Sequence, residues 1–226
     1  MQKGVFVLKK KISIKLFLVF VIIALIFALV VERTDFSRPV RAADMENGWQ
    51  LILVNSKYRV PESWESEFVT LSCGERVDKR IYPDLQNMFD AALSEGIDLV
   101  VRSGYRSEKE QKEILIKKIG AFRKEGYGNT EAAEKAIDLV SMPGTSDHQL
   151  GIAVDINAEN GTEKNEAYKW LSENSYRFGF IVRYPSGKSH ITGISYEPWH
   201  FRYVGKSHAR NMYESGQCLE EYLQQF

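Results

Sequence analysis

The sequence predicts a compact α+β domain with a central antiparallel sheet. Segments with strand-like and helix-like patterns are interleaved over residues 49–226, mostly with short connections, and neither an internal repeat nor a low-complexity tract interrupts them. The length of 226 residues suits one such domain and an appendage, and the 44% apolar and 27% charged residues are ordinary for a folded soluble domain. A long apolar run near the N-terminus supplies the appendage.

The ordered domain is expected to begin with two strands separated by a helix. Residues 49–54 form an apolar run typical of a strand. Residues 83–95 carry apolar side chains at helical spacing, and Gly96 is placed to end that helix. Residues 97–102 follow as a second strand.

Two helices should come next. Ser107-Glu-Lys-Glu has the form of a capping box, so a helix is expected to begin at Ser107 and to run to about Gly120. Residues 130–140 form an alanine-rich helix that Pro143-Gly144 should stop. The last part of the chain then predicts strands over 151–157, 179–183 and 200–204 and a helix over 165–174.

The apolar run from Leu16 to Val31 predicts a membrane-spanning helix. Such a helix needs about 20 apolar residues, whereas the core of a cleaved signal peptide has roughly 7–15 and is followed by a small-residue cleavage site. The run ends in Val-Val-Glu-Arg without that site, which favours an uncleaved signal anchor; cleavage near Ala42 is the alternative. Five lysines and no acid in residues 1–31 keep the N-terminus cytoplasmic.

These features predict a single-pass protein of the cell membrane with its folded domain outside the cytoplasm. The expected parts are a basic cytoplasmic tail (1–15), a transmembrane signal anchor (16–31), a linker (32–48) and the ordered domain (49–226). The domain and linker carry five more acidic than basic groups, because the five lysines of the tail balance the formal charge of zero. We therefore expect no nucleic-acid partner, since phosphate binding needs concentrated positive charge.

Cys73 and Cys218 leave two interpretations open. In an extracytoplasmic domain they could form a disulfide that joins early and late parts of the chain. They could equally be two free thiols, because sequence does not give the separation of their Cα atoms.

The stretch Ser146-Asp-His-Gln-Leu-Gly-Ile-Ala-Val-Asp155 places a histidine seven residues ahead of a carboxylate. Alternation along the strand puts Ala153 and Asp155 on one face, and an acid there is costly to bury unless it is paired or binds a metal. His148 lies just before the strand and can turn back towards Asp155. By itself this pair is also consistent with a simple hydrogen-bonded His–Asp contact.

A second stretch, Glu197-Pro-Trp-His200, strengthens the metal interpretation. His200 supplies a third ligand, and Glu197 supplies a carboxylate that need not bind the metal. Hydrolytic zinc sites have three protein ligands, one open position for water and a base to accept a proton. The alternative is that Glu197 is a surface acid and His200 belongs to an aromatic cluster.

Together the two stretches resemble the M15 zinc D-alanyl-D-alanine peptidases, and most closely their VanY-type D,D-carboxypeptidases. Ser146, His148, Gly151, Ala153 and Asp155 match the pattern S-x-H-x-x-G-x-A-x-D, and Glu197 to His200 match the second signature. Ser103-Gly-Tyr-Arg-Ser107, with Gln111 after it, is similar to an upstream motif of the family. The likeness runs from about Trp49 to the C-terminus.

The resemblance implies a role for each matched residue. His148, Asp155 and His200 would bind one Zn²⁺ per chain, and Glu197 would be the general base. Arg106 would polarise the scissile carbonyl or stabilise the oxyanion. Gln111 and Ser146 would hold amide or carboxylate groups of the substrate.

The implied activity is removal of the terminal D-alanine from peptidoglycan precursor stems that end in D-Ala-D-Ala, which would support resistance to glycopeptides such as vancomycin. Three alternatives stay open: an L,D-carboxypeptidase of cell-wall tetrapeptides, a D,D-dipeptidase, and a non-catalytic module that binds peptidoglycan. A membrane anchor argues against the dipeptidase, whose soluble substrate is cytoplasmic, and Glu197 argues against the binding module, which needs no base.

Overall fold

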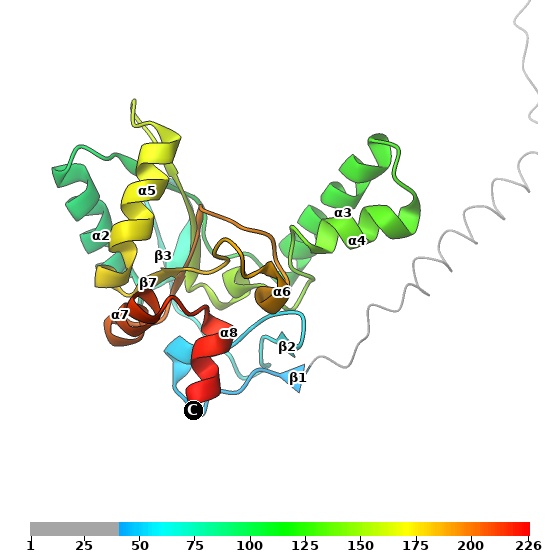
Figure 1. Cartoon of the computed structure of the whole chain (residues 1–226), viewed down its shortest axis with the longest axis horizontal. Helices are drawn as coiled ribbons and strands as arrows, with labels where there is room; N and C mark the ends of the chain where they lie inside the picture. The colour runs from blue at the N-terminus through cyan, green and yellow to red at the C-terminus, as the bar shows by residue number, and fades with distance from the viewer. Residues whose placement is uncertain (1–40) are drawn as a thin grey trace, which may run out of the picture. The chain divides into compact units, whose positions relative to one another are not determined.

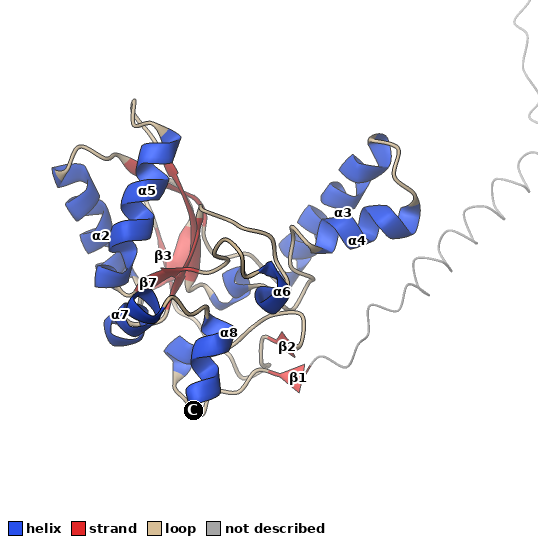
Figure 2. Cartoon of the chain, viewed as in Figure 1, coloured by secondary structure: helices blue, strands red, loops and turns tan. Residues whose placement is uncertain are grey.

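A four-stranded antiparallel sheet forms the centre of the computed structural model, which describes residues 41–226 (Figures 1 and 2). Its strands lie in the order β5 (Leu99–Ser103), β6 (Ala153–Ala158), β8 (His200–Tyr203) and β7 (Phe180–Val182), and each runs antiparallel to its neighbour. The predicted α+β class with an antiparallel sheet is therefore confirmed.

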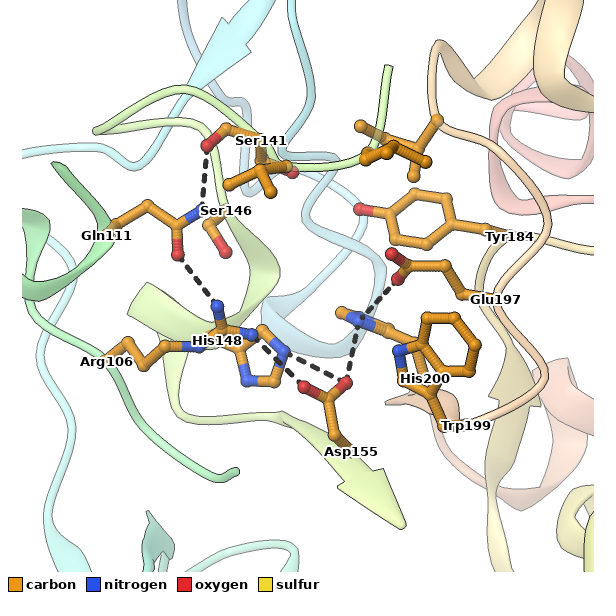
Figure 3. A pocket seen from close by; sticks show the side chains of 13 residues that line it. Arg106, Gln111, Ser141, Ser146, His148, Asp155, Tyr184, Glu197, Trp199 and His200 are labelled. Atoms are coloured by element: carbon orange, nitrogen blue, oxygen red, sulfur yellow. Dashed lines mark hydrogen bonds and ion pairs between the residues drawn. The ribbon is translucent and has the colours of Figure 1, made fainter. Parts of the chain in front are cut away.

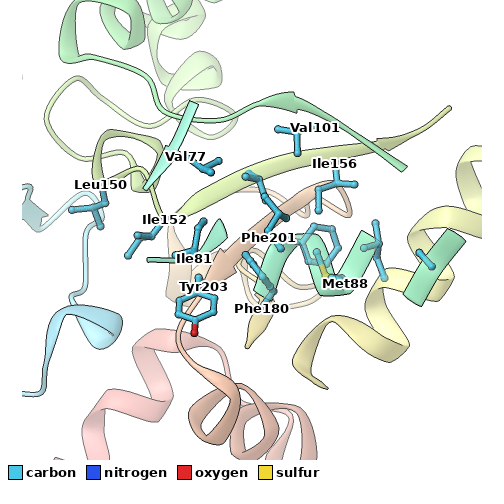
Figure 4. Close-up of a cluster of buried hydrophobic side chains, with 14 of the residues drawn as sticks. Val77, Ile81, Met88, Val101, Leu150, Ile152, Ile156, Phe180, Phe201 and Tyr203 are labelled. Carbon is cyan, nitrogen blue, oxygen red and sulfur yellow. The ribbon is translucent and has the colours of Figure 1, made fainter. Parts of the chain in front are cut away.

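The two faces of this sheet have different chemistry because side chains alternate along each strand. On β6, Val154 and Ile156 point into the main hydrophobic core, and Phe201 does so on β8 (Figure 4). Asp155 lies on the opposite face, as its place in the alternation predicts, and so does its partner in register, His200. One face of the sheet thus holds the core and the other carries the candidate site.

Two helices cover the core face. α2 (Tyr82–Ser94) buries Leu85, Met88 and Ala92, and α5 (Lys164–Asn174) buries Ala167, Trp170 and Leu171. Both helices keep the boundaries that the apolar spacing predicts to within one residue. Near the C-terminus, α7 (Lys206–Ser215) and α8 (Leu219–Tyr222) bury a second apolar cluster against Ile181 of β7.

Two antiparallel helices, α3 (Glu108–Lys124) and α4 (Asn129–Ile137), form a hairpin that projects away from the sheet (Figure 1). The Ser107 side chain accepts a hydrogen bond from the backbone of Glu110, and the Glu110 side chain accepts one from the backbone of Ser107. The predicted capping box is therefore confirmed. α3 runs four residues beyond its expected end, and α4 ends before residue 140.

Smaller elements complete the domain. Two-residue strands β1 (Arg41–Ala42) and β2 (Tyr58–Arg59) pair in parallel, and β3 (Phe68–Thr70) pairs with β4 (Arg76–Asp78) as a hairpin. α6 (Ser189–Thr192) is a single turn between β7 and β8. These elements and the C-terminal helices were not predicted.

The strand expected over residues 49–54 is wrong. Trp49–Leu51 forms a short 3₁₀ helix, and Ile52 and Val54 are fully buried without a strand partner. Backbone carbonyls in this segment accept hydrogen bonds from a buried guanidinium group: Arg202 Nη2 donates to the carbonyl oxygens of Gln50 and Ile52. The run is apolar because its side chains are buried. Its backbone carbonyls are hydrogen-bonded by arginine side chains instead of by a neighbouring strand.

The predicted tail and transmembrane anchor (1–31) lie outside the described residues, as do residues 32–40 of the predicted linker. Within residues 41–226, none of the helices has the length and apolar character needed to cross a membrane. The last part of the predicted linker makes contacts with the domain: Arg41–Ala42 pairs with β2, and Ala43 belongs to the hydrophobic core.

Both cysteines are free thiols, so the structure does not support the disulfide interpretation. Cys73 is exposed, whereas Cys218 is buried ahead of α8. Burial raises the pKa of the Cys218 thiol to about 11, which keeps it protonated and unreactive at neutral pH.

Candidate active site

The register of the central sheet brings distant parts of the sequence to one point. Asp155 of β6 lies opposite His200 of β8, and on its other side it pairs with Ser103 of β5. His148 belongs to a 3₁₀ turn (Asp147–Leu150) that ends at Gly151, whose φ of 72° turns the chain into β6. A Cβ at that position would also lie 2.8 Å from the Phe68 ring. Both the positive φ and this close contact therefore favour glycine at position 151.

Three side chains converge on this point (Figure 3). Asp155 Oδ1 lies 3.4 Å from His148 Nε2 and 3.2 Å from His200 Nδ1. Both histidines are almost fully buried, while the Asp155 side chain is 19% exposed. The structure therefore brings together all three residues that the sequence proposed as metal ligands.

The donor set fits a zinc ion. Ligand atoms 2.0–2.2 Å from a tetrahedral zinc lie about 3.3–3.6 Å apart, and the distances of 3.4 Å and 3.2 Å to Asp155 Oδ1 are close to this range. One ligand atom from each of the three residues can be chosen so that all lie within 4.8 Å of one another. His148 Nε2 and Asp155 Oδ1 are buried and make no hydrogen bond to any described residue, as expected of atoms whose partner is a cation.

The protonation states of the two histidines differ. Burial lowers the pKa of His148 to about 4, so its Nε2 lone pair is available at neutral pH. Burial also opposes charge on His200, but the facing carboxylates of Asp155 and Glu197 outweigh this and raise its pKa to about 9. Burial works against ionised Asp155 as well, yet the two histidines that face its carboxylate hold the carboxyl pKa well below its usual range. A bound cation would replace the His200 proton between these groups.

The orientation of His148 is fixed by the backbone of the upstream motif. His148 Nδ1 lies 2.7 Å from the carbonyl oxygen of Gly104, which requires the proton on Nδ1 and leaves Nε2 facing Asp155. Gly104 itself passes close to another chain segment: a Cβ at this position would lie 2.2 Å from the carbonyl oxygen of Arg76. Glycine here allows the carbonyl to reach the histidine.

Glu197 stands beside the three ligands. Its Oε2 lies 3.4 Å from His200 Nδ1, and its side chain is 13% exposed, so it is open to the pocket. Its backbone N–H donates to the carbonyl of Tyr184, and its carbonyl accepts from the N–H of His200. These contacts hold the carboxylate next to the ligands, where it can accept a proton from a group bound there.

Arg106, Gln111 and Ser146 all line the same pocket. Arg106 Nη2 lies 3.3 Å from Asp155 Oδ2, and its Nη1 donates to Gln111 Oε1 at 3.1 Å. Gln111 Nε2 donates to the carbonyl of Ser141. Burial lowers the pKa of Arg106, although the nearby carboxylates of Asp155 and Glu197 oppose this effect and favour its charge. The guanidinium is therefore a fixed cation beside the ligands.

The pocket has a volume of about 170 Å³, the share of roughly five or six water molecules. The sequence did not single out Tyr184, Ser141 or the apolar wall formed by Leu139, Val140 and Ile194. Trp199 also lines the pocket.

Comparisons with known proteins agree with this geometry. Residues 74–206 match the family model described as VanY, D-alanyl-D-alanine carboxypeptidase. A D-alanyl-D-alanine carboxypeptidase of Enterococcus faecalis (strain ATCC 700802 / V583) is 51% identical over 179 residues, which cover 79% of this chain and 67% of that protein.

Two solved structures have the same fold. One is a mutant vancomycin resistance D,D-pentapeptidase VanY from a VanB-type cassette in complex with Zn(II), with 52% identity, a TM-score of 0.76 and coverage of 77% of this chain and 99% of that one. The other is VanYB in complex with D-alanine-D-alanine, with 51% identity, a TM-score of 0.76 and coverage of 78% and 98%. The chain belongs to the VanY family of D-alanyl-D-alanine carboxypeptidases.

Proposed function

We propose that this protein is a zinc D,D-carboxypeptidase that removes the terminal D-alanine from peptidoglycan precursor stems ending in D-Ala-D-Ala. The observation that carries the proposal is the arrangement of His148, Asp155 and His200 with Glu197 directly beside them. Metal-binding modules need the first three residues, but only hydrolysis needs a carboxylate base next to them. The names of the relatives agree with this assignment.

Zinc held by His148, Asp155 and His200 would supply a Lewis acid that polarises the scissile carbonyl and makes water more acidic. Glu197 takes the proton from the attacking water and then delivers it to the nitrogen of the leaving D-alanine. Arg106 stabilises the negative charge that develops on the carbonyl oxygen, since its guanidinium is fixed at the pocket wall. Gln111 and Ser146 offer polar groups for the amide and carboxylate of the substrate.

Loss of the terminal D-alanine destroys the D-Ala-D-Ala ligand of glycopeptide antibiotics. We therefore propose that the activity supports resistance to vancomycin.

The decisive experiment is mass analysis of the purified full-length chain with zinc and three substrates: stem pentapeptide, stem tetrapeptide and D-Ala-D-Ala. The proposal predicts loss of one D-alanine from the pentapeptide at the highest rate. Faster cleavage of the tetrapeptide would instead identify an L,D-carboxypeptidase, and preference for the free dipeptide would identify a D,D-dipeptidase. Zinc binding without hydrolysis of any of the three substrates would instead identify a non-catalytic module that binds peptidoglycan.

We also propose that residues 16–31 anchor the protein in the cell membrane as a single pass, with the catalytic domain outside the cytoplasm. The apolar run and the lysines before it support this topology. Anchoring would raise the effective concentration of the enzyme near membrane-linked precursors. The protein should fractionate with membranes and keep its N-terminal sequence; a mature form that starts near Ala43 in the culture fluid would contradict the anchor.

A further inference from the structure

A cluster of buried charges lies behind His200, on the side away from the pocket. Asp147, Arg183 and Arg202 are each 0% exposed. Arg183 Nε donates to Asp147 Oδ2 at 2.8 Å, and Arg202 Nη1 donates to Asp147 Oδ1 at 2.6 Å. Arg183 also donates two hydrogen bonds of 2.8 Å to Glu220 of α8. Two positive and two negative charges therefore balance within the cluster.

His200 connects this cluster to the site, because its two ring nitrogens face in different directions. Nδ1 lies 3.2 Å from Asp155 and 3.4 Å from Glu197. Nε2 lies 4.0 Å from Asp147 Oδ2. This Nε2 is buried, and no described residue is within hydrogen-bonding geometry of it.

The chemistry of imidazole determines what Nε2 needs. A neutral ring carries one N–H, so a ring that gives its Nδ1 lone pair to a metal must hold its proton on Nε2. A buried N–H without an acceptor is costly. In His148 the two nitrogens have the opposite roles: Nδ1 has the Gly104 carbonyl as the acceptor for its proton, and Nε2 faces the site. For His200, the facing acceptor is the Asp147 carboxylate.

We infer that Asp147 is a positioning residue for His200. Its carboxylate accepts a hydrogen bond from the Nε2–H of His200 when the site holds its metal. The inference rests on the proposed zinc site. Each Asp147 oxygen already accepts one arginine hydrogen bond, which fixes the carboxylate and leaves a lone pair on Oδ2. A shift of about 1 Å shortens the 4.0 Å separation to a hydrogen bond. Such carboxylate–histidine–metal contacts orient the ring and strengthen it as a ligand.

The test compares zinc affinity of two variants of the full-length chain, purified in detergent, by competition with a chelator. Asp147→Asn removes the acceptor charge facing His200. Glu220→Gln removes the other carboxylate partner of Arg183 without touching His200, so it is the matched control for unbalanced buried charge. We expect zinc affinity to fall about 10- to 100-fold in Asp147→Asn and to stay close to wild type in Glu220→Gln. Equal losses in both variants, or no loss in either, would overturn the inference.

A measurement on the wild-type protein keeps the inference testable if Asp147→Asn does not fold. In the zinc-loaded chain, ¹⁵N-labelled histidine spectra should show His200 with a proton on Nε2 that is protected from solvent exchange. A proton on Nδ1, or a rapidly exchanging one, would contradict the inference. Both readouts use zinc without peptide, so a protein that binds zinc in this way but cleaves no pentapeptide would refute only the proposed function.

Discussion

Arg106 keeps its guanidinium 3.3 Å from Asp155 while it also lines the pocket, so one side chain connects a proposed metal ligand with the pocket. The sequence motif predicted that this arginine reaches the cleft, and the structure places it there. The motif did not predict its contact with Asp155, which depends on how β5 and β6 pair.

Replacement of this arginine should separate catalysis from metal binding. Arg106→Ala is expected to keep zinc but to lower kcat about 10²- to 10³-fold, because a fixed donor to the developing oxyanion is lost. Arg102→Ala is the matched control, since Arg102 is exposed and bridges Glu159 away from the pocket. Steady-state kinetics on pentapeptide measure the effect, and similar kcat values in the two variants would argue against the assigned role.

At this scale, motifs predicted that His148, Asp155 and His200 lie together, because the motifs combine scarce residue types at fixed spacing. Tyr184 and Ser141 had no such signal, since a tyrosine after a buried strand and a serine after a helix have many ordinary uses. Asp147 was also missed, although it adjoins His148 in sequence. Its importance depends on Arg183 and Arg202, which only the fold brings to it.

At the scale of elements, the turn after β5 places the Gly104 carbonyl against His148. Gly104→Ala should push this turn away from Arg76, because the new Cβ would lie 2.2 Å from a backbone oxygen. We expect the free energy of unfolding to fall by roughly 1–3 kcal/mol and zinc affinity to weaken as well.

Gly120→Ala in α3 provides the control for this substitution. Nothing lies within 4 Å of a Cβ there, so the variant should gain about 0.5–1 kcal/mol and bind zinc normally. Urea titration and chelator competition measure the two quantities. If Gly104→Ala matched Gly120→Ala in both, the turn would not be what orients His148.

Apolar periodicity predicted α2 and α5 and the four strands of the central sheet, because each presents a regular apolar stripe or alternation to the core, whereas α3 was predicted from its capping box. It failed for residues 49–54, where arginine side chains satisfy the backbone in place of a strand. The short strands β1 to β4 have two or three residues each, too few for any period to be visible.

For the whole molecule, α8 is tied to the sheet through Glu220 and the buried Arg183. Burial works against a charged Glu220, but the charge of Arg183 and its hydrogen bonds outweigh this and lower the carboxyl pKa. A lowered folded-state pKa means that the contact stabilises the protein above the unfolded value of about 4.5 and is lost as the pH falls towards the folded-state pKa.

Glu220→Gln should therefore be less stable than wild type at neutral pH, and the difference should shrink below about pH 4.5. Urea midpoints at several pH values test this, with Glu173→Gln, at an exposed position on α5, as the control that should follow wild type throughout. A gap between Glu220→Gln and wild type that stayed constant with pH would show that the carboxylate charge is not what holds α8.

The assignment of hydrolysis depends most on Glu197, which stands next to His200 without being one of the three proposed ligands. In Glu197→Gln the shape is kept but the side chain cannot take a proton from water. Zinc content should stay at about one per chain, and kcat on pentapeptide should fall by at least about 10²- to 10⁴-fold. His200→Ala is the contrasting variant, which should lose most of its zinc. Near wild-type hydrolysis by Glu197→Gln with zinc in place would contradict the mechanism, and loss of zinc would make Glu197 a ligand.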